Sequence, residues 1–299
     1  MKTSTLKVII VFFLLIPLQG ISQVVNKWFF GNGAALDFNS GSPVSISGSA
    51  MNAVEGSSSI SDISGNLLFY TDGIKVWNNT HIQMPNGFGL FGHWSSPQSA
   101  LIVPIPGSSN VFYIFTVDYN FGSNGLRYSI VDMNLQGGLG DVTAKNVLLS
   151  NNVYEKLSGI RHSNGIDVWI IYHHHSTDRM HANLLTSSGI NSTSVISNLG
   201  PIISNEIAYT TGWIKGSPDG CKVAMGAWWK NSFLLMDFNN ETGTFSNLIN
   251  IQSSNYPDAY GVEFSPDGKL LYGATASPSK VFQFNLQAGT AADIKLKYF

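Results

Sequence analysis

Apolar and polar positions along the chain repeat a hairpin pattern, in which a short polar turn is followed by a run of β-branched and aromatic residues. The clearest copies are GSPDGCKVA at 216–224 and FSPDGKLLY at 264–272, and weaker copies lie at 61–70, 104–113 and 162–169. Glycine or asparagine in each turn suits the positive φ that tight hairpins need. Hairpins that recur about every 42 to 58 residues are typical of propeller blades.

The rest of each repeat has room for two more strands. A further apolar run ends in a turn at 131–138, 237–243 and 284–289, and no segment keeps a 3.6-residue apolar period. We therefore predict an all-β fold, a β-propeller of four-stranded blades. Residues 28–38 read as outer strands without an inner pair, and the chain stops inside an apparent strand at 294–299. The pattern predicts five to six blades of a propeller that has seven when complete, with the C-terminal part missing.

The first 22 residues have the features of a secretory signal peptide. Lys2 and Lys7 precede an apolar run at 8–18, and small residues at Gly20 and Ser22 suit a cut after residue 22. The apolar run is too short for a bilayer, which needs about 20 residues. We predict export to the cell surface or the medium, with a propeller domain at 23–299 and no membrane-spanning segment in the mature chain.

Composition and charge narrow the class of protein. Only 11% of the 299 residues are charged and the net charge is −2, so nucleic acid is not an expected partner. Thirty glycines disfavour helices. Cys221 is the one cysteine, which excludes a disulfide framework; its place in an apolar run predicts a buried, inert thiol.

Several motifs carry a resemblance to a known family. WFFGNGAALDF at 28–38, GNLLFYTDG at 65–73, VWN at 76–78 and MPNG at 84–87 resemble the opening of large bacterial surface proteins associated with gliding motility and type IX secretion. YGVEFSPDG at 260–268 is also similar to Tol-system and Trp-Asp-repeat propellers. The resemblance implies a monomeric N-terminal propeller within a longer cell-surface protein, and it brings no established catalytic residues.

A histidine cluster is the first candidate for chemistry. His173, His174 and His175 are followed by Asp178 and His181. On a strand, His173 and His175 would share a face, as in some zinc sites, but a third ligand would need a fold-back. The alternative is a solvated polar loop, and we predict no metal and no cofactor.

Loop placement gives the candidate binding site. In a propeller, the loops between second and third strands lie on the same face as the blade-to-blade connections, and such loops concentrate ligand sites. Aromatic rings beside carboxylates suit a flat sugar ring or an extended peptide. The predicted ligand-binding residues of this face are Asp72, Trp94, Asp118, Tyr119, His173, His175, Trp228, Trp229 and Asp258.

These observations favour a non-enzymatic interaction module that binds a polysaccharide or a protein in adhesion. The alternative is a hydrolase or lyase acting on glycans, with carboxylates such as Asp72, Asp118 and Glu55. A purely structural spacer is a third hypothesis. No nucleophile elbow, phosphate-binding loop or zinc-protease motif occurs in the sequence.

Overall fold

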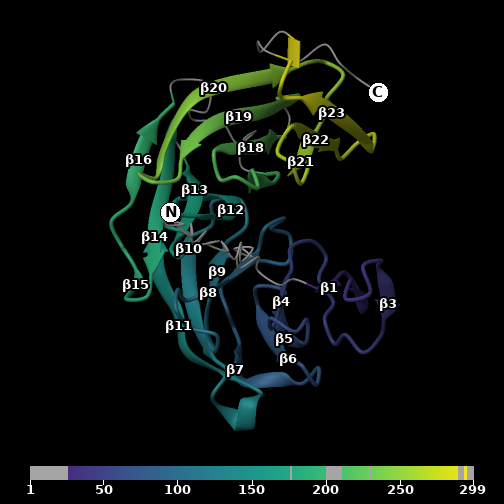
Figure 1. The fold of residues 1–299 in the computed structure, drawn as a ribbon, viewed down its shortest axis with the longest axis vertical. Coiled ribbons are helices and arrows are strands. Elements are labelled where there is room, and N and C mark those ends of the chain that lie inside the picture. The colour runs from purple at the N-terminus through teal and green to yellow at the C-terminus, as the bar shows by residue number, and fades with distance from the viewer. Residues whose placement is uncertain (1–25, 176, 200–210, 229, 289–292, 295–299) are drawn as a thin grey trace, which may run out of the picture.

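The computed structural model describes residues 26–175, 177–199, 211–228, 230–288 and 293–294. They form six small antiparallel sheets that follow one another in chain order as the blades of a β-propeller (Figure 1). The prediction of an all-β propeller is confirmed, and the described part of the chain spans six blades. The predicted signal peptide at 1–22 lies outside the described residues.

The sheets have the following strands. The first contains β1 (Lys27–Phe30), β2 (Ala34–Asp37) and β3 (Val44–Ile46). The second contains β4 (Ser58–Ser61), β5 (Leu67–Thr71), β6 (Lys75–Asn78) and β7 (Gln83–Phe88). The third contains β8 (Ala100–Pro104), β9 (Val111–Val117), β10 (Leu126–Asp132) and β11 (Asp141–Ser150), with a 3₁₀ turn at Gln136–Gly138.

The remaining three sheets complete the arc. The fourth contains β12 (Val153–Arg161), β13 (Val168–His174), β14 (Arg179–Thr186), β15 (Gly189–Ile190) and β16 (Val195–Asn198). The fifth contains β17 (Ile214–Gly216), β18 (Lys222–Ala227), β19 (Ser232–Asn239) and β20 (Thr244–Gln252). The sixth contains β21 (Ala259–Phe264), β22 (Leu270–Thr275) and β23 (Lys280–Asn285).

The blades differ from the predicted four-strand pattern at three places. The first and sixth sheets show three strands among the described residues, and the fourth has five because β15 and β16 both pair with β14. Neighbouring sheets meet through their first strands, from β4 with β8 to β17 with β21. Because β1 also packs against β4, it is the inner strand of its sheet, and the interpretation of residues 28–38 as outer strands only was wrong.

The core lies between the sheets. In a central blade both sheet faces are covered, so Phe69 and Tyr70, which are neighbours in β5, are both fully buried. In the first sheet Phe29 is 3% exposed and packs toward the second sheet, whereas the adjacent Trp28 is 48% exposed. Val281 of the sixth sheet is 69% exposed. The end sheets therefore bury one face well and the four central sheets bury both.

The repeated turns join the first and second strands of the blades. Ser217 Oγ donates to Asp219 Oδ1 (2.5 Å) and accepts the Lys222 N–H (2.9 Å). Ser265 and Asp267 of the sixth sheet make the same pair of contacts at 2.7 Å and 2.9 Å, with Leu270 as the N–H donor. The Ser-Pro-Asp-Gly sequence is thus a hydrogen-bonded turn unit, which is why it recurs.

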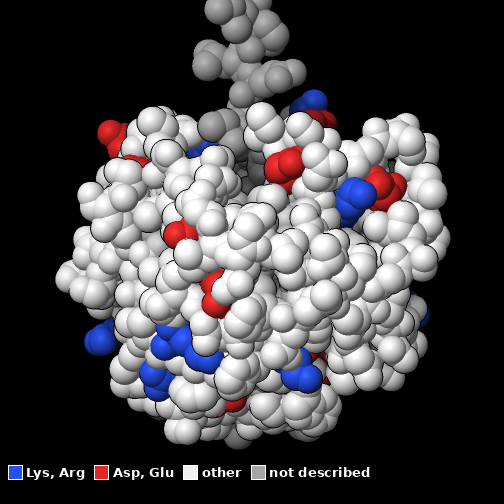
Figure 2. Space-filling view, turned by 90° about the horizontal axis from the view of Figure 1, so that it is seen from below, with Lys and Arg blue, Asp and Glu red and all other residues white. Residues whose placement is uncertain are grey.

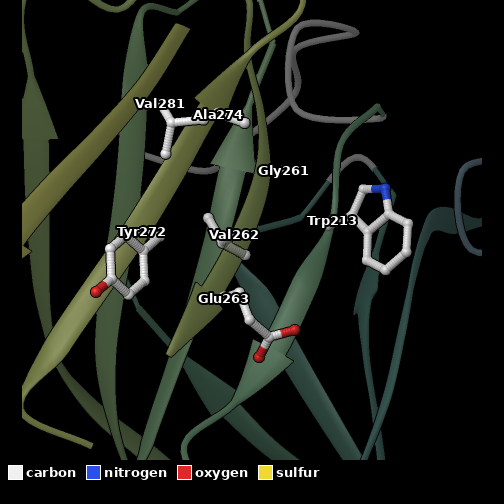
Figure 3. A pocket seen from close by; sticks show the side chains of 7 residues that line it. All are labelled: Trp213, Gly261, Val262, Glu263, Tyr272, Ala274 and Val281. Carbon is white, nitrogen blue, oxygen red and sulfur yellow. The ribbon is translucent and has the colours of Figure 1, made fainter. Parts of the chain in front are cut away.

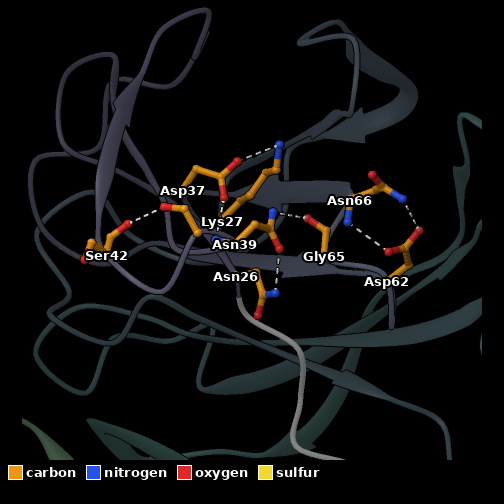
Figure 4. Close-up of polar contacts among 9 residues, drawn as sticks. Asn26, Lys27, Asp37, Asn39, Ser42, Asp62, Gly65 and Asn66 are labelled. Atoms are coloured by element: carbon orange, nitrogen blue, oxygen red, sulfur yellow. Dashed lines mark hydrogen bonds and ion pairs between the residues drawn. The ribbon is translucent and has the colours of Figure 1, made fainter.

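A weaker copy of the turn also fixes the first sheet. Asp62 Oδ1 accepts the Asn66 N–H at 2.8 Å, and Asn39 Nδ2 donates to the Gly65 carbonyl of this turn at 3.1 Å (Figure 4). Lys27 and Asp37 form an ion pair across β1 and β2 at 3.1 Å. The Asn39 contact attaches the first sheet to the turn of the second sheet.

The surface carries few charges. In the view of Figure 2, separate Lys, Arg, Asp and Glu side chains stand out against a mostly uncharged surface. In the described segments, no helix is long and apolar enough to cross a membrane. Cys221 is exposed, because it lies in the turn before β18 rather than in the strand, so the prediction of a buried thiol was wrong.

Candidate functional site

The predicted loop face is a real cluster in the structure. The Gly92 N–H in the connection between the second and third sheets donates to the Gly73 carbonyl in the β5–β6 loop at 2.9 Å. The His175 N–H after β13 donates to the Asn152 carbonyl in the connection before β12 at 2.6 Å. Strand loops and blade connections therefore meet at one face, which we call the rim face.

A bulge in β12 places two charged residues in the middle of this arrangement. Val153 pairs with His174 and Leu157 with Tyr172, so three residues of β12 lie opposite one residue of β13. Such a bulge breaks the regular alternation of side chains. As a result Glu155 and Lys156, adjacent in sequence, are both fully buried and contact different neighbouring sheets.

Glu155 is the most unusual group of the rim face. Its Oε1 accepts the Asn120 N–H at 2.8 Å, whereas its buried Oε2 has no hydrogen-bond partner among the residues that the structure describes. Burial raises the pKa of Glu155 to about 7; the Asn120 hydrogen bond and Lys156 act in the opposite direction, and Glu55 and Asp118 add to the rise. A carboxyl group with such a pKa can accept and return a proton near neutral pH.

Lys156 extends from β12 toward the fifth sheet. Its Nζ donates to the Thr211 carbonyl at 2.7 Å and to the Gly226 carbonyl at 2.9 Å. Burial lowers the pKa of Lys156 to about 7, and the neighbouring Glu155 opposes this shift. Burial therefore favours the uncharged form of both groups. Perturbed pKa values of this kind are typical of functional sites.

Glu55 and Tyr260 form the exposed side of the same cluster. Tyr260 donates its phenolic hydrogen to Glu55 Oε2 at 3.0 Å, and Ser95 Oγ donates to Glu55 Oε1 at 3.2 Å. Burial, with the charges of Glu55 and Glu155, raises the pKa of Tyr260 well above its usual value. The hydroxyl therefore stays protonated and remains a hydrogen-bond donor.

Trp228 packs against this tyrosine. The two rings meet edge to face, with centroids 5.1 Å apart and an interplanar angle of 78°. The Trp228 indole Nε1 is buried and has no acceptor within the described part of the chain. Tyr260 thus contacts the unused N–H donor of Trp228 and is acted on by the charge of Glu155, which holds the unused acceptor.

Two of the three predicted carboxylates, Asp72 and Asp118, serve the loops themselves. Asp72 Oδ1 accepts the N–H groups of Ile74 and Lys75 at 2.8 and 2.7 Å. Asp118 caps its own loop through the Tyr119 N–H at 2.8 Å, although its charge also acts on Glu155. Asp258 has a φ of 51° and is partly buried in the connection before β21.

The predicted aromatic residues divide into two groups. Trp94 and Tyr119 are 57% and 44% exposed, and both stack on His93. Trp228 belongs to the Tyr260 cluster, and Trp229 lies outside the described residues. The rim face therefore brings most of the predicted aromatic residues close to Glu55.

The histidines do not share one site. His173 is fully buried, its Nε2 lies 3.1 Å from the Thr177 carbonyl, and burial lowers its pKa to about 3. His175 instead stacks on Phe121 with ring centroids 3.9 Å apart. Within the described ranges, no group of three or more His, Cys, Asp or Glu side chains is placed to hold a metal ion.

Sequence reasoning missed Glu155 and Lys156. The available signal is the run VYEKL at 153–157, where two charges interrupt an apolar strand in a chain that is only 11% charged. Charged residues are rarely fully buried unless they have partners, so such a pair marks either a bulge or a site. The bulge itself depends on contacts with other sheets.

Two surface hollows lie elsewhere and lack this chemistry. The first, of about 220 Å³, lies on the sixth sheet (Figure 3). Its one charged lining residue is Glu263, which forms an ion pair with Lys215 at 2.9 Å. The second, of about 360 Å³, is lined by the turns around Arg161, His162 and Asp219. Asp219 is occupied by its turn, so neither hollow offers an unpaired acid.

Comparisons with known proteins bear on the fold. No family model and no curated protein matches the chain. A periplasmic gluconolactonase from Pseudomonas aeruginosa is similar in structure, with a TM-score of 0.53, 13% identity, and coverage of 86% of this chain and 74% of that one. Proposed 6-phosphogluconolactonases from Bacteroides fragilis and Bacteroides uniformis give TM-scores of 0.52 and 0.50 at 12% identity. Each covers 84% of this chain, and the matches span 72% and 74% of those chains.

These neighbours correct one prediction. The expectation of a non-enzymatic module is contradicted, since the similar propellers are named as lactonases and point to an enzymatic propeller. Identities of 12–13% show a shared fold, so the reaction is a matter for the site's own chemistry. The resemblance to gliding-motility surface proteins stays a prediction.

Proposed function

We propose that this chain is an exported hydrolase that opens a sugar-derived cyclic ester, with Glu155 as the general base. The observation that supports this most is the buried Glu155 carboxyl, whose Oε2 has no partner among the described residues, although the charges of Glu55 and Lys156 act on the group. A buried acceptor without a partner costs free energy, so a water or a ligand group is expected to bind it.

The chemistry follows from the groups of the site. Glu155 accepts a proton from water as the water oxygen bonds to the ester carbonyl carbon. The resulting oxyanion accepts a hydrogen bond from the unused Trp228 N–H, and a second one from the Tyr260 hydroxyl once its hydrogen turns away from Glu55. When the ring C–O bond breaks, Glu155 returns the proton to the leaving oxygen and the product is a hydroxy acid. No cofactor is needed for this sequence.

The substrate class rests on two supports. The similar propellers are named for lactones of gluconate and of its 6-phosphate. The charges that act on Glu155 are the carboxylates of Glu55 and Asp118 and the buried Lys156, so an uncharged lactone fits the site better than a phosphorylated one. The predicted signal peptide at 1–22 and the periplasmic location of the Pseudomonas enzyme support export.

The direct test is hydrolysis of D-glucono-1,5-lactone by the chain starting at Gln23, followed in a pH-stat above the spontaneous rate. We expect Glu155→Gln to lower kcat by about 100-fold or more, because general-base catalysis typically supplies that factor. Glutamine keeps the acceptor for the Asn120 N–H, so the loop is retained. Circular dichroism and urea unfolding check that the variant folds.

Asp132→Asn is the matched control. Asp132 is also an acid that accepts backbone and side-chain N–H groups, from Asn134, but it lies in the β10–β11 turn, away from the rim face. This variant is expected to keep the full rate. Equal rates for wild type and Glu155→Gln, or no hydrolysis of the lactone by the wild type, would contradict the proposed function.

A further inference from the structure

A stack of three rings stands beside the acidic cluster. His93 lies between Trp94 and Tyr119, with ring centroids 5.3 Å and 5.0 Å away and interplanar angles of 34° and 27°. Trp94 and His93 come from the connection between the second and third sheets, and Tyr119 from the β9–β10 loop. Two loops from different strands therefore share one aromatic cluster, in which Tyr119 stacks on His93 and Trp94 is tilted against it, and which we call the aromatic platform.

Hydrogen bonds within the two loops hold the aromatic platform in place. The Ser95 N–H donates to His93 Nδ1 at 3.1 Å, which fixes the orientation of the central ring. Asp118 accepts the Tyr119 N–H at 2.8 Å and the Asn124 N–H at 3.1 Å, which fixes the loop that carries Tyr119. The rings are thus ordered before any ligand binds, and a ligand would lose little free energy in arranging them.

The same loop links the platform to the proposed catalytic cluster. Ser95 follows Trp94 directly, and its Oγ donates to Glu55 Oε1 at 3.2 Å. Glu55 in turn accepts from Tyr260 and acts on the charge of Glu155. A ligand lying on Trp94 would therefore extend toward Glu55 and the groups beyond it.

We propose that the aromatic platform binds the apolar C–H face of a sugar ring and so positions the substrate for the Glu155 cluster. This inference rests on the proposed function, of which it names the substrate-binding part. Half-exposed tryptophan and tyrosine rings present their negative π faces to solvent, and the C–H groups of a pyranose ring carry partial positive charge. The hydroxyl groups at the ring edge find acceptors in Glu55. A purely apolar ligand would leave that carboxylate without a role.

Binding can be tested without catalysis. The probe is 1,5-anhydro-D-glucitol, a pyranose ring with no ester to hydrolyse, in saturation-transfer NMR with irradiation of the aromatic protons. Transfer to the ring C–H protons is expected in wild type and in Glu155→Gln. It is expected to disappear in Trp94→Ala and in Tyr119→Ala. Both replaced side chains are largely exposed, so these variants are expected to fold normally.

Phe88→Ala is the control for a lost exposed aromatic ring. Phe88 is 52% exposed on β7, where it packs on the Lys145 ammonium group and not on the platform, and its variant should keep the transfer. In lactone hydrolysis, Trp94→Ala should raise KM about tenfold with little change in kcat, which matches the loss of one stacking contact.

The outcomes separate this inference from the proposed function. Transfer that persists unchanged in both platform variants, or no transfer in wild type, overturns the platform even if the lactone is hydrolysed. Loss of transfer in those variants supports the platform even if Glu155→Gln keeps its activity or the lactone is not a substrate, and in that case the proposed reaction fails alone.

Discussion

Acidic residues occur at both ends of the blades, and they behave in opposite ways. In the Ser-Pro-Asp-Gly turns, Asp219 and Asp267 are held by N–H and O–H donors of their own hairpin. Their pKa values are lowered by these hydrogen bonds. At the rim face, Glu155 has one hydrogen bond from another loop, an empty acceptor and a raised pKa.

The difference shows where function can arise in a repeated fold. A turn acid has all its partners within a few residues, so every repeat can carry it and it stabilises the hairpin. The rim acid interacts with two other parts of the chain: the β9–β10 loop, through the Asn120 N–H and the charge of Asp118, and the charge of Glu55. Only one blade provides this combination, and its contacts leave binding capacity unused.

The largest difference in the free energy of unfolding is expected between alanine variants of two glycines, one at the rim face and one in a turn. A Cβ at Gly226 on β18 would lie 2.2 Å from the Tyr260 carbonyl oxygen, and backbone at an inner strand cannot move away. Gly226→Ala should destabilise the protein by about 3 kcal/mol. Gly268→Ala in the Asp267 turn meets nothing within 4 Å and has only a φ of 68° to accommodate, which costs about 1 kcal/mol.

Urea unfolding followed by tryptophan fluorescence measures both variants. Equal losses of stability would mean that the inner strands can separate at Gly226 as easily as a turn adapts at Gly268. The rim face would then be a loose assembly of loops, and the contrast drawn above would not hold.

The predictability of the two regions follows the same division. The turns at 216–224 and 264–272 identified the blades because their residue types and spacing are set locally by the hairpin. The face that carries the loops could also be predicted, since it follows from propeller topology. Glu155 could not, because its role depends on a bulge in β12 and on loops 35 residues or more away in sequence.

Among the predicted rim residues, type alone was a poor guide. Asp72 and His173 have the right chemistry for a ligand, but Asp72 caps its own turn and His173 is fully buried. Trp94 and Tyr119 stayed exposed because the loops that carry them project from the face. Packing between blades decides which polar groups keep an unused hydrogen-bonding atom. A local sequence pattern therefore cannot predict them.

The free energy of unfolding should depend on pH through the two buried groups, Glu155 and Lys156. The pKa of Glu155 is raised from 4.5 to about 7, so its folded form binds the proton more tightly, and stability falls as pH rises from about 4.5 to 7. The pKa of Lys156 is lowered to about 7, so the unfolded chain binds more protons above that pH, and stability rises again from about 7 to 10. The lowered pKa values of His173 and His181 add a rise in stability below about pH 6.5, so the contribution of Glu155 is measured as the difference between wild type and variant.

One variant tests the fall in stability below pH 7, and another tests the rise above it. Glu155→Gln should remove the fall between pH 4.5 and 7, a change on the order of 2 kcal/mol, while Lys156→Met should flatten the rise above pH 7. Urea midpoints measured at intervals from pH 4 to 10 give both slopes. A difference between wild type and variant that does not change with pH would show that the replaced group is not shifted by burial.

The smallest effect is expected at the turn acid. Burial alone would raise the pKa of Asp219, but hydrogen bonds from Ser217 and Cys221 outweigh it and lower the pKa. Its contribution is therefore present above the unfolded value near 3.9 and is lost as the pH falls below it. Asp219→Ala should cost about 1 kcal/mol at pH 7 and nothing at pH 2, with lactone hydrolysis unchanged. A loss of activity in this folded variant would mean that the turn end of the blade takes part in the site, and the separation of the two kinds of acid would be wrong.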